Sequence, residues 1–371
     1  MGTQARKEPR GRIGAFALSP SASFALVRRA LLTNSARGDK PETAAIPIRS
    51  CPRRNVFSIG TGQLDSLAGA SDTGFMTGID EPLGPTSRVF FSQRLRLHYV
   101  DWGNPSAPPL LLIHGGQDHC RNWDWVADRL RGEWHIIAPD LRGHGDSQWS
   151  PDGNYSMAGY LYDLAQLIHQ QQLAPVNIIA HSLGGNIVLR YAGVYPEKVR
   201  KIIAIEGLGP SPKMLAERLK RGIAERMAKW IEEQRALSGR LPRRYPSIED
   251  AFKRMQEANR HLSPEQARHL TQHGVNQNED GTYSWKFDNY VRAWPPYDMT
   301  VTEVETLWSL ISCPTLLIYG KESWASNPLE DGRANHFRDA RVEGFDKAGH
   351  WVHHDRLDAF VDRARAFLAG D

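Results

Sequence analysis

The stretch Val176-Asn177-Ile178-Ile179-Ala180-His181-Ser182-Leu183-Gly184-Gly185 runs from an apolar, β-branched segment directly into a serine and two glycines. Its first half is typical of a buried strand, and a helical pattern follows it. A chain that turns sharply from strand to helix at Ser182 brings the two backbones close together, so small residues are needed two positions before and after the serine. Ala180 and Gly184 supply them. The pattern predicts a nucleophile elbow that exposes the Ser182 hydroxyl, with an unreactive turn as the alternative.

The alternation of strand and helix continues on both sides of this stretch. Strand patterns cover 89–92, 94–101, 110–114, 134–140, 201–206, 315–320 and 340–345, and helical patterns cover 123–131, 157–172, 185–195 and 355–368. Short apolar runs separated by amphipathic helices indicate a mostly parallel sheet covered by helices. We therefore predict an α/β fold with an eight-stranded sheet, in which only the opening pair of strands is antiparallel.

Residues 209–310 break this alternation, because about a hundred residues separate two strands that a short connection would normally join. Helical patterns at 214–237, 248–259 and 264–272 predict a helical cap subdomain between strands 6 and 7, with the core formed by residues 76–208 and 311–371. The segment holds many of the chain's aromatic residues, which as a set predict an apolar acyl pocket. These residues are Trp230, Tyr283, Trp285, Phe287, Tyr290, Trp294 and Tyr297.

A glycine-lined turn follows another apolar strand, in the sequence His114-Gly115-Gly116-Gln117. Backbone N–H groups at such a turn point outward at the carboxyl end of a strand and can bind an oxyanion. Gly116 and Leu183, the residue that opens the helix after the elbow, are the two predicted donors. An ordinary turn between strand and helix is the alternative.

The candidate base lies near the C-terminus, in Ala348-Gly349-His350-Trp351. We expect most of the 14 histidines to be solvated, and His353 and His354 to begin a helix. His350 differs from them because it stands in a loop between strand and helix, beside a glycine.

Residues 87–371 resemble the α/β-hydrolase family. The resemblance rests on the elbow, on His114-Gly115, on Asp140-Leu141-Arg142-Gly143-His144-Gly145-Asp146-Ser147 and on Gly349-His350. It implies that the segment from Asp140 is a turn bracing the floor of the active site, so that Asp140, Arg142 and His144 are architectural. The segments 262–267 and 285–288 resemble cap regions of serine-hydrolase-like and carbon–carbon bond hydrolase relatives.

The chain departs from the family at the acid of the triad. Members usually carry Gly-x-x-Asp after the seventh strand, whereas this chain has Gly320-Lys321-Glu322-Ser323. Glu322 is one residue early, and Glu206, at the end of an apolar strand, matches the alternative location that haloalkane dehalogenases use. We favour Glu206, because a glutamate ending a buried strand is harder to explain without a function.

Together these residues predict a serine hydrolase that cleaves a small or medium hydrophobic ester through an acyl-enzyme, without a cofactor or metal. Thioester, lactone and carbon–carbon bond hydrolysis and cofactor-free perhydrolysis remain open, whereas dehalogenases and epoxide hydrolases of this type have an aspartate in place of Ser182. The alternative from another class is a ligand-binding or sensing protein that keeps the fold.

Composition excludes other classes of protein. The 371 residues are 40% hydrophobic and 24% charged, as in globular proteins, and no apolar run approaches the roughly 18 residues of a membrane span. Three cysteines without metal-ligand spacing predict reduced thiols rather than disulfides or a zinc site. No nucleic-acid-binding signature is present, so we expect a small-molecule substrate.

The N-terminal segment differs from the rest of the chain. Residues 1–75 contain eleven Lys and Arg against five Asp and Glu, which accounts for the net charge of +4. Low periodicity and many Ser, Gly, Pro and Arg residues predict a disordered extension of a cytoplasmic protein. Mitochondrial targeting and a natural start at Met76 are the alternatives.

Overall fold

An eight-stranded sheet forms the centre of the computed structural model, which describes residues 84–370. The sheet strands are β1 (Thr86–Ser92), β2 (Leu95–Asp101), β3 (Pro109–Ile113), β4 (His135–Pro139), β5 (Val176–His181), β6 (Val199–Ile205), β9 (Thr315–Gly320) and β10 (Ala340–Phe345). Their spatial order is β1-β2-β4-β3-β5-β6-β9-β10. The expectations on residues 1–75 and on a start at Met76 lie outside the described residues.

The directions of the strands agree with those predicted from the sequence. β2 pairs antiparallel with both β1 and β4, and all other neighbours in the sheet are parallel. The predicted mostly parallel, eight-stranded sheet is confirmed. Because parallel strands end at the same edge, the loops after β3, β5, β6 and β9 gather there.

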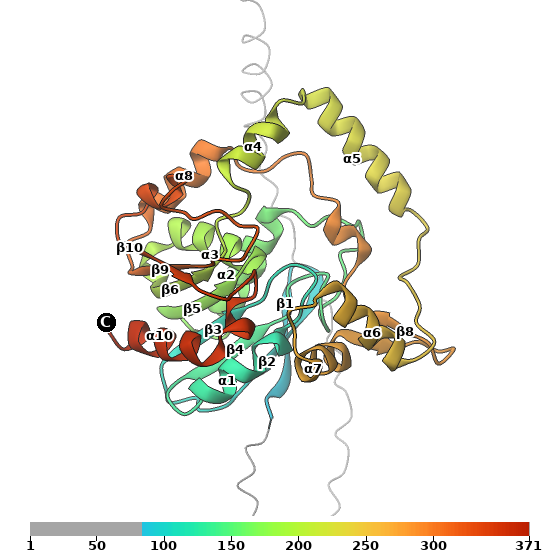
Figure 1. Ribbon diagram of the computed structural model, residues 1–371, viewed down its shortest axis with the longest axis horizontal. Coiled ribbons are helices and arrows are strands. Elements are labelled where there is room, and N and C mark those ends of the chain that lie inside the picture. Colours follow the sequence, from blue (N-terminus) through green and yellow to red (C-terminus); the bar gives the residue numbers. More distant parts are fainter. Residues whose placement is uncertain (1–83, 371) are drawn as a thin grey trace, which may run out of the picture. The chain divides into compact units, whose positions relative to one another are not determined.

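Helices cover both faces of the sheet (Figure 1). They are α1 (Asp124–Leu130), α2 (Met157–Gln170), α3 (Leu183–Val194), α8 (Val301–Leu310), α9 (Val352–Asp355) and α10 (Leu357–Ala369). Successive residues of a strand point to opposite faces. In β5, Ile178 packs with α2, α3 and α8, whereas Ile179 packs with α1 and α10. The central strands are therefore apolar at nearly every position, as buried parallel strands are.

The insert, residues 209–310, connects β6 to β9. Apart from α8 it contains α4 (Pro212–Leu219), α5 (Ile223–Leu237), α6 (Ile248–Ala258), α7 (Pro264–Gly274) and the two-stranded sheet of β7 (Val275–Gln277) and β8 (Tyr283–Trp285). The single helix expected over 214–237 is wrong: extended backbone at Gly222 (φ −59°, ψ 160°) separates α4 from α5. The β7–β8 pair and α8 were not expected.

The helices of the insert differ in how many of their residues are buried. α4 and α5 contain no buried residue. α6 and α7 enclose a small apolar cluster of Phe252, Leu262 and Leu270, against which Trp125 and Trp351 pack. α8 packs on α3 so closely that a Cβ at Gly193 would lie 2.3 Å from the carbonyl oxygen of Leu307. This last helix of the insert therefore belongs to the layer that covers the sheet.

Within residues 84–370, no helix combines the length and the apolar composition that crossing a bilayer requires.

Candidate active site

Ser182 stands between β5 and α3 in a strained backbone conformation, with φ 50° and ψ −113°. Its N–H donates to the carbonyl oxygen of Ile205 in the neighbouring strand (2.8 Å). A Cβ at Gly184 would lie 2.6 Å from the carbonyl oxygens of Ile113 and His114, and one at Gly185 would lie 2.6 Å from the Cα of Gly207. Close backbone crossing is thus the physical reason for the small residues of the turn.

The turn after β3 lies directly beside Ser182. A Cβ at Gly115 would lie 2.8 Å from Nδ1 of His181 and 3.2 Å from Cβ of Ser182, and one at Gly116 would lie 3.8 Å from Cδ2 of Leu183. The structure therefore brings Gly116 and Leu183, the predicted oxyanion donors, together. Leu183 is the first residue of α3, where helix N–H groups have no partner within the helix.

His114 holds this turn in place. Its Nδ1 donates to the carbonyl oxygen of Gly115 (2.6 Å), and its Nε2 accepts from the N–H of Leu141 (3.0 Å). Burial lowers the pKa of His114 to about 3, so the ring is neutral and can both donate and accept. The histidine is a structural part of the predicted oxyanion turn.

Glu206 and His350 meet at the same edge of the sheet. Oε2 of Glu206 accepts hydrogen bonds from Nδ1 of His350 and from the Ser323 hydroxyl (2.8 Å), and Oε1 accepts from the N–H of Gly320 (3.0 Å). The Glu206 side chain is 0% exposed, whereas that of His350 is 24% exposed. Like Ser182, Glu206 has a positive φ, 48°. Its buried carboxylate is satisfied by hydrogen bonds on both oxygens.

Glu322, the other candidate acid, does not meet His350. Its side chain is exposed, and its N–H donates to the carbonyl oxygen of Ala348 (3.0 Å). The next residue, Ser323, stands where the family resemblance implies the acid, and its hydroxyl is bonded to Glu206.

Two residues hold His350 in place, and neither was predicted from the sequence. Nε2 of His181 donates to the carbonyl oxygen of His350 (2.9 Å). Burial first, and then the neighbouring His350, lower the pKa of His181 well below its usual value, which keeps its ring neutral. The ring of Trp324 lies 5.1 Å from that of His350, between ring centroids. The position of His181 directly before Ser182 was the one available signal.

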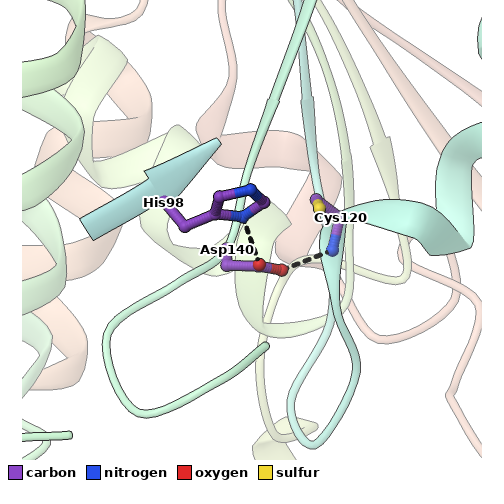
Figure 2. A group of neighbouring side chains, drawn as sticks. All are labelled: His98, Cys120 and Asp140. Carbon is purple, nitrogen blue, oxygen red and sulfur yellow. Dashed lines mark hydrogen bonds and ion pairs between the residues drawn. The ribbon is translucent and has the colours of Figure 1, made fainter. Parts of the chain in front are cut away.

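Asp140 organises the turn after β4 (Figure 2). Its carboxylate accepts hydrogen bonds from Nδ1 of His98 (2.7 Å) and from the N–H of Cys120 (2.7 Å). It also accepts one from the N–H of Asp146 (2.9 Å). Burial, the largest single influence, would raise the pKa of Asp140, but the hydrogen bonds from His98 and Cys120 and the nearby His98 and His114 together outweigh it, and the pKa lies below its usual value. His98, Cys120 and Asp140 could place metal-ligand atoms within 4.8 Å of one another. Their buried hydrogen bonds nevertheless explain the grouping as part of the turn.

Arg142 and His144 are also held within the fold. Nε and Nη2 of Arg142 donate to both carboxylate oxygens of Asp163 (2.5 and 2.7 Å), and this carboxylate also accepts from the Ser92 hydroxyl. Nδ1 of His144 donates to the carbonyl oxygen of Arg142 (2.9 Å). The geometry agrees with the architectural role that the family resemblance implies.

A second group with metal-ligand atoms, Asp124, His269 and His273, joins α1 to α7. Nε of Arg121 donates to both carboxylate oxygens of Asp124 (2.9 and 2.7 Å), and Nε2 of His269 lies 3.0 Å from Oδ2. Hydrogen bonds within the protein explain why these side chains lie together, and the group is not part of the surroundings of Ser182.

A cavity of about 450 Å³ opens between the insert and the loops of the core. The core contributes Gly116, Gln117, Asp118, His119 and Trp351, among other residues. Of the seven aromatic residues predicted to shape the pocket, Trp285 and Phe287 line this cavity, whereas Trp294 and Tyr297 are exposed. The cavity thus reaches the neighbour of His350 and one of the two predicted oxyanion donors.

The family model of the alpha/beta hydrolase fold matches residues 108–357. Esterase Rv0045c of Mycobacterium tuberculosis is 27% identical over 82% of this chain and 96% of its own length. A serine hydrolase-like protein of Danio rerio is 28% identical over 63% of this chain and 72% of its own length.

Solved structures agree with this assignment at the level of the fold. A thioesterase domain from the curacin biosynthetic pathway superposes with a TM-score of 0.67 at 23% identity, over 76% of this chain and 99% of that domain. A crystal structure of the M. tuberculosis esterase superposes with a TM-score of 0.61 at 23% identity, over 78% of this chain and 93% of the esterase. The chain belongs to the α/β-hydrolase family and is a hydrolase.

Proposed function

We propose that the protein hydrolyses a small or medium carboxylic ester with a hydrophobic acyl part, using Ser182 as nucleophile, His350 as base and Glu206 as acid. The observation that carries the proposal is the hydrogen bond from Nδ1 of His350 to the buried carboxylate of Glu206, beside a serine held at a strained turn. A carboxylate in this place orients the imidazole and stabilises the imidazolium that forms during attack.

The reaction has two halves. In the first, Nε2 of His350 takes the Ser182 proton while Oγ attacks the carbonyl carbon, and the oxyanion accepts hydrogen bonds from the N–H groups of Gly116 and Leu183. His350 then protonates the departing alkoxide as the ester bond breaks, which leaves an acyl-serine. In the second half, His350 takes a proton from water, the hydroxide attacks the acyl carbon, and the carboxylic acid leaves as Ser182 regains its proton.

The insert is proposed to act as a cap over this site. The carbonyl oxygen of Leu270 accepts from Nε2 of His119 (3.0 Å), and the N–H of Asp288 donates to the carbonyl oxygen of Gly143 (2.8 Å). These bonds hold the walls of the cavity against the core. Trp285 and Phe287 give it apolar surface, which supports a hydrophobic acyl part.

The name of the M. tuberculosis relative, an esterase, supports ester rather than thioester, lactone or carbon–carbon bond cleavage. Labelling with a fluorophosphonate tests the nucleophile, and p-nitrophenyl esters of increasing acyl length test the substrate. We expect labelling that is lost in Ser182→Ala, and turnover that rises with acyl length until the cavity is filled. Labelling equal in wild type and Ser182→Ala would contradict the proposal.

A further inference from the structure

The wall that the insert contributes to the cavity beside Gly116 and Trp351 is strongly cationic. Arg243 precedes α6, Arg254 lies on α6, and Lys286 and Arg292 follow β8, and all four line the cavity. The one carboxylate in the lining, Asp118, comes from the core. It is buried and accepts hydrogen bonds from the side chain of Asn122 and from the N–H of His119.

Among the described residues, two of these cations have no carboxylate partner and a third has only a distant one. Lys286 pairs with Asp146 at 2.8 Å. Within residues 84–370, by contrast, no carboxylate lies within ion-pair distance of Arg243 or Arg292, and the carboxylate paired with Arg254, Glu257, lies 3.8 Å away. Burial raises the pKa of Asp118 to about 6, and its carboxylate is bonded to Asn122 and His119 rather than to these cations. The cavity is therefore electropositive along its insert wall, and such a cleft concentrates anions.

Two of the guanidinium groups lie over aromatic rings in cation–π contacts. Cζ of Arg243 lies 5.0 Å from the ring centroid of Tyr245, and that of Arg292 lies 5.4 Å from the ring centroid of Phe287. Tyr245 is buried, and its hydroxyl accepts from the indole nitrogen of Trp285 (3.2 Å). A guanidinium lying over an anchored ring keeps its N–H donors directed sideways, where a planar anion can accept two of them.

We propose that the substrate carries a carboxylate at the end remote from the scissile bond, bound by Arg243, Arg254 and Arg292. The inference rests on the proposed ester hydrolysis, and it changes the expectation of a wholly hydrophobic acyl part by adding a carboxylate at the far end of an apolar chain. The scissile carbonyl lies at the core wall near Gly116, the apolar chain lies against Trp285 and the neighbouring apolar side chains, and the carboxylate meets the arginines. Arginine pairs bidentately with carboxylates, which fixes the orientation of the ligand as well as adding affinity.

Two esters with acyl chains of equal length test this directly. We expect the wild-type protein to hydrolyse mono-p-nitrophenyl adipate with a kcat/KM roughly ten- to hundredfold above that for p-nitrophenyl hexanoate, the range of one hydrogen bond to a charged group. The preference should reside mainly in KM, because the arginines are remote from the reacting atoms. Raising the sodium chloride concentration should reduce it by screening. Equal kcat/KM for the two esters at low salt overturns the inference.

Substitution identifies the residues responsible. The variant Arg243→Gln, Arg254→Gln, Arg292→Gln should lose the preference for the adipate ester, measured as the ratio of the two kcat/KM values within the variant. The matched control is Arg235→Gln, which removes an arginine of the insert that is paired with Glu232 and does not line the cavity. A preference that survives in the triple variant contradicts the assignment, and a preference lost in the control shows a nonspecific charge effect.

Binding separates failure of this inference from failure of the proposed function. If wild type cleaves neither ester, calorimetric titration of Ser182→Ala with monomethyl adipate and with methyl hexanoate still tests the arginines. We expect the carboxylate-bearing ester to bind roughly ten- to hundredfold more tightly, and the difference to vanish when the three arginines are also replaced. Equal binding of the two esters overturns the inference.

Discussion

The hydroxyl of Ser323 donates a 2.8 Å hydrogen bond to Oε2 of Glu206, the same oxygen that accepts from Nδ1 of His350. Ser323 occupies the place after β9 where the family usually carries its acid. In the proposed triad the carboxylate comes instead from Glu206, directly after β6, and Ser323 contributes a hydrogen-bond donor that orients it. Residues 206 and 323 thus lie side by side, and the carboxylate stands at residue 206 rather than at residue 323.

Ser182→Ala should abolish hydrolysis while leaving the fold intact, because it removes the attacking oxygen and retains a small side chain at the turn. Loss of the nucleophile should lower kcat by a factor of about 10⁴ or more. Steady-state kinetics and circular dichroism of the purified variant measure the two effects. Wild-type turnover in a correctly folded variant would disprove the assignment.

Glu206→Gln should lower kcat by about 10³–10⁴-fold, since an amide neither fixes the tautomer of His350 nor stabilises its protonated form. Glu322→Gln is the matched control, because it makes the same change on an exposed side chain of a neighbouring loop. Its kcat should stay within about twofold of wild type, as expected for a solvated residue. A large loss confined to Glu322→Gln would move the acid to that residue.

Ser323→Asp should partly rescue Glu206→Gln. The Ser323 oxygen lies 2.8 Å from Oε2 of Glu206, so a carboxylate at residue 323 can reach the surroundings of His350. We expect the double variant to exceed Glu206→Gln by about tenfold or more in kcat, the effect of one charged hydrogen bond. Ser323→Asn in the same background supplies a neutral control of similar size. Equal rates for the Asp and Asn double variants would show that residue 323 cannot serve the imidazole.

His354 should make the protein sensitive to acid. Both ring nitrogens are buried without a hydrogen-bond partner among the described residues, and burial lowers the pKa of His354 to about 3. Between that value and about pH 6.5, the unfolded chain binds a proton that the folded chain excludes, so stability falls as pH falls through this range. His354→Phe should remove this loss, which amounts to about 2 kcal/mol between pH 7 and pH 5.

Urea denaturation at both pH values measures the difference in unfolding free energy between wild type and His354→Phe. Substitution of the exposed His169 provides the control and should leave the pH dependence unchanged. If His354→Phe loses as much stability on acidification as wild type, His354 does not cause the acid sensitivity.

Local patterns of sequence predicted much of the fold. The sheet strands were predicted from short apolar runs. The turn at Ser182 was predicted from the small residues on either side of it, which are needed because the strand and helix backbones cross closely there. Glu206 could be preferred over Glu322 because a charge at the end of a buried strand needs a partner. Its partner, His350, could also be predicted, because it stands beside a glycine in a loop between a strand and a helix.

What the sequence missed depends on tertiary packing. His181 and Ser323 matter through contacts with residues more than a hundred positions away, which no local pattern encodes. The expectation that most histidines are solvated was wrong, since seven of the 14 are buried in the structure, including His353 and His354. The cationic wall arises because Arg243, Arg254 and Arg292 come from separate segments that meet only at the cavity.

Ser182 and Glu206 directly follow the adjacent strands β5 and β6, and both have a positive φ, 50° and 48°. Such a backbone costs an ordinary residue of order 1–3 kcal/mol and costs glycine little. Glycine at residue 182 would therefore relieve strain while removing the proposed nucleophile, whereas glycine at residue 206 would also remove a buried carboxylate that binds three donors. Selection of variants by heat resistance alone should enrich Ser182→Gly, so a stability screen of this enzyme needs an activity readout beside it.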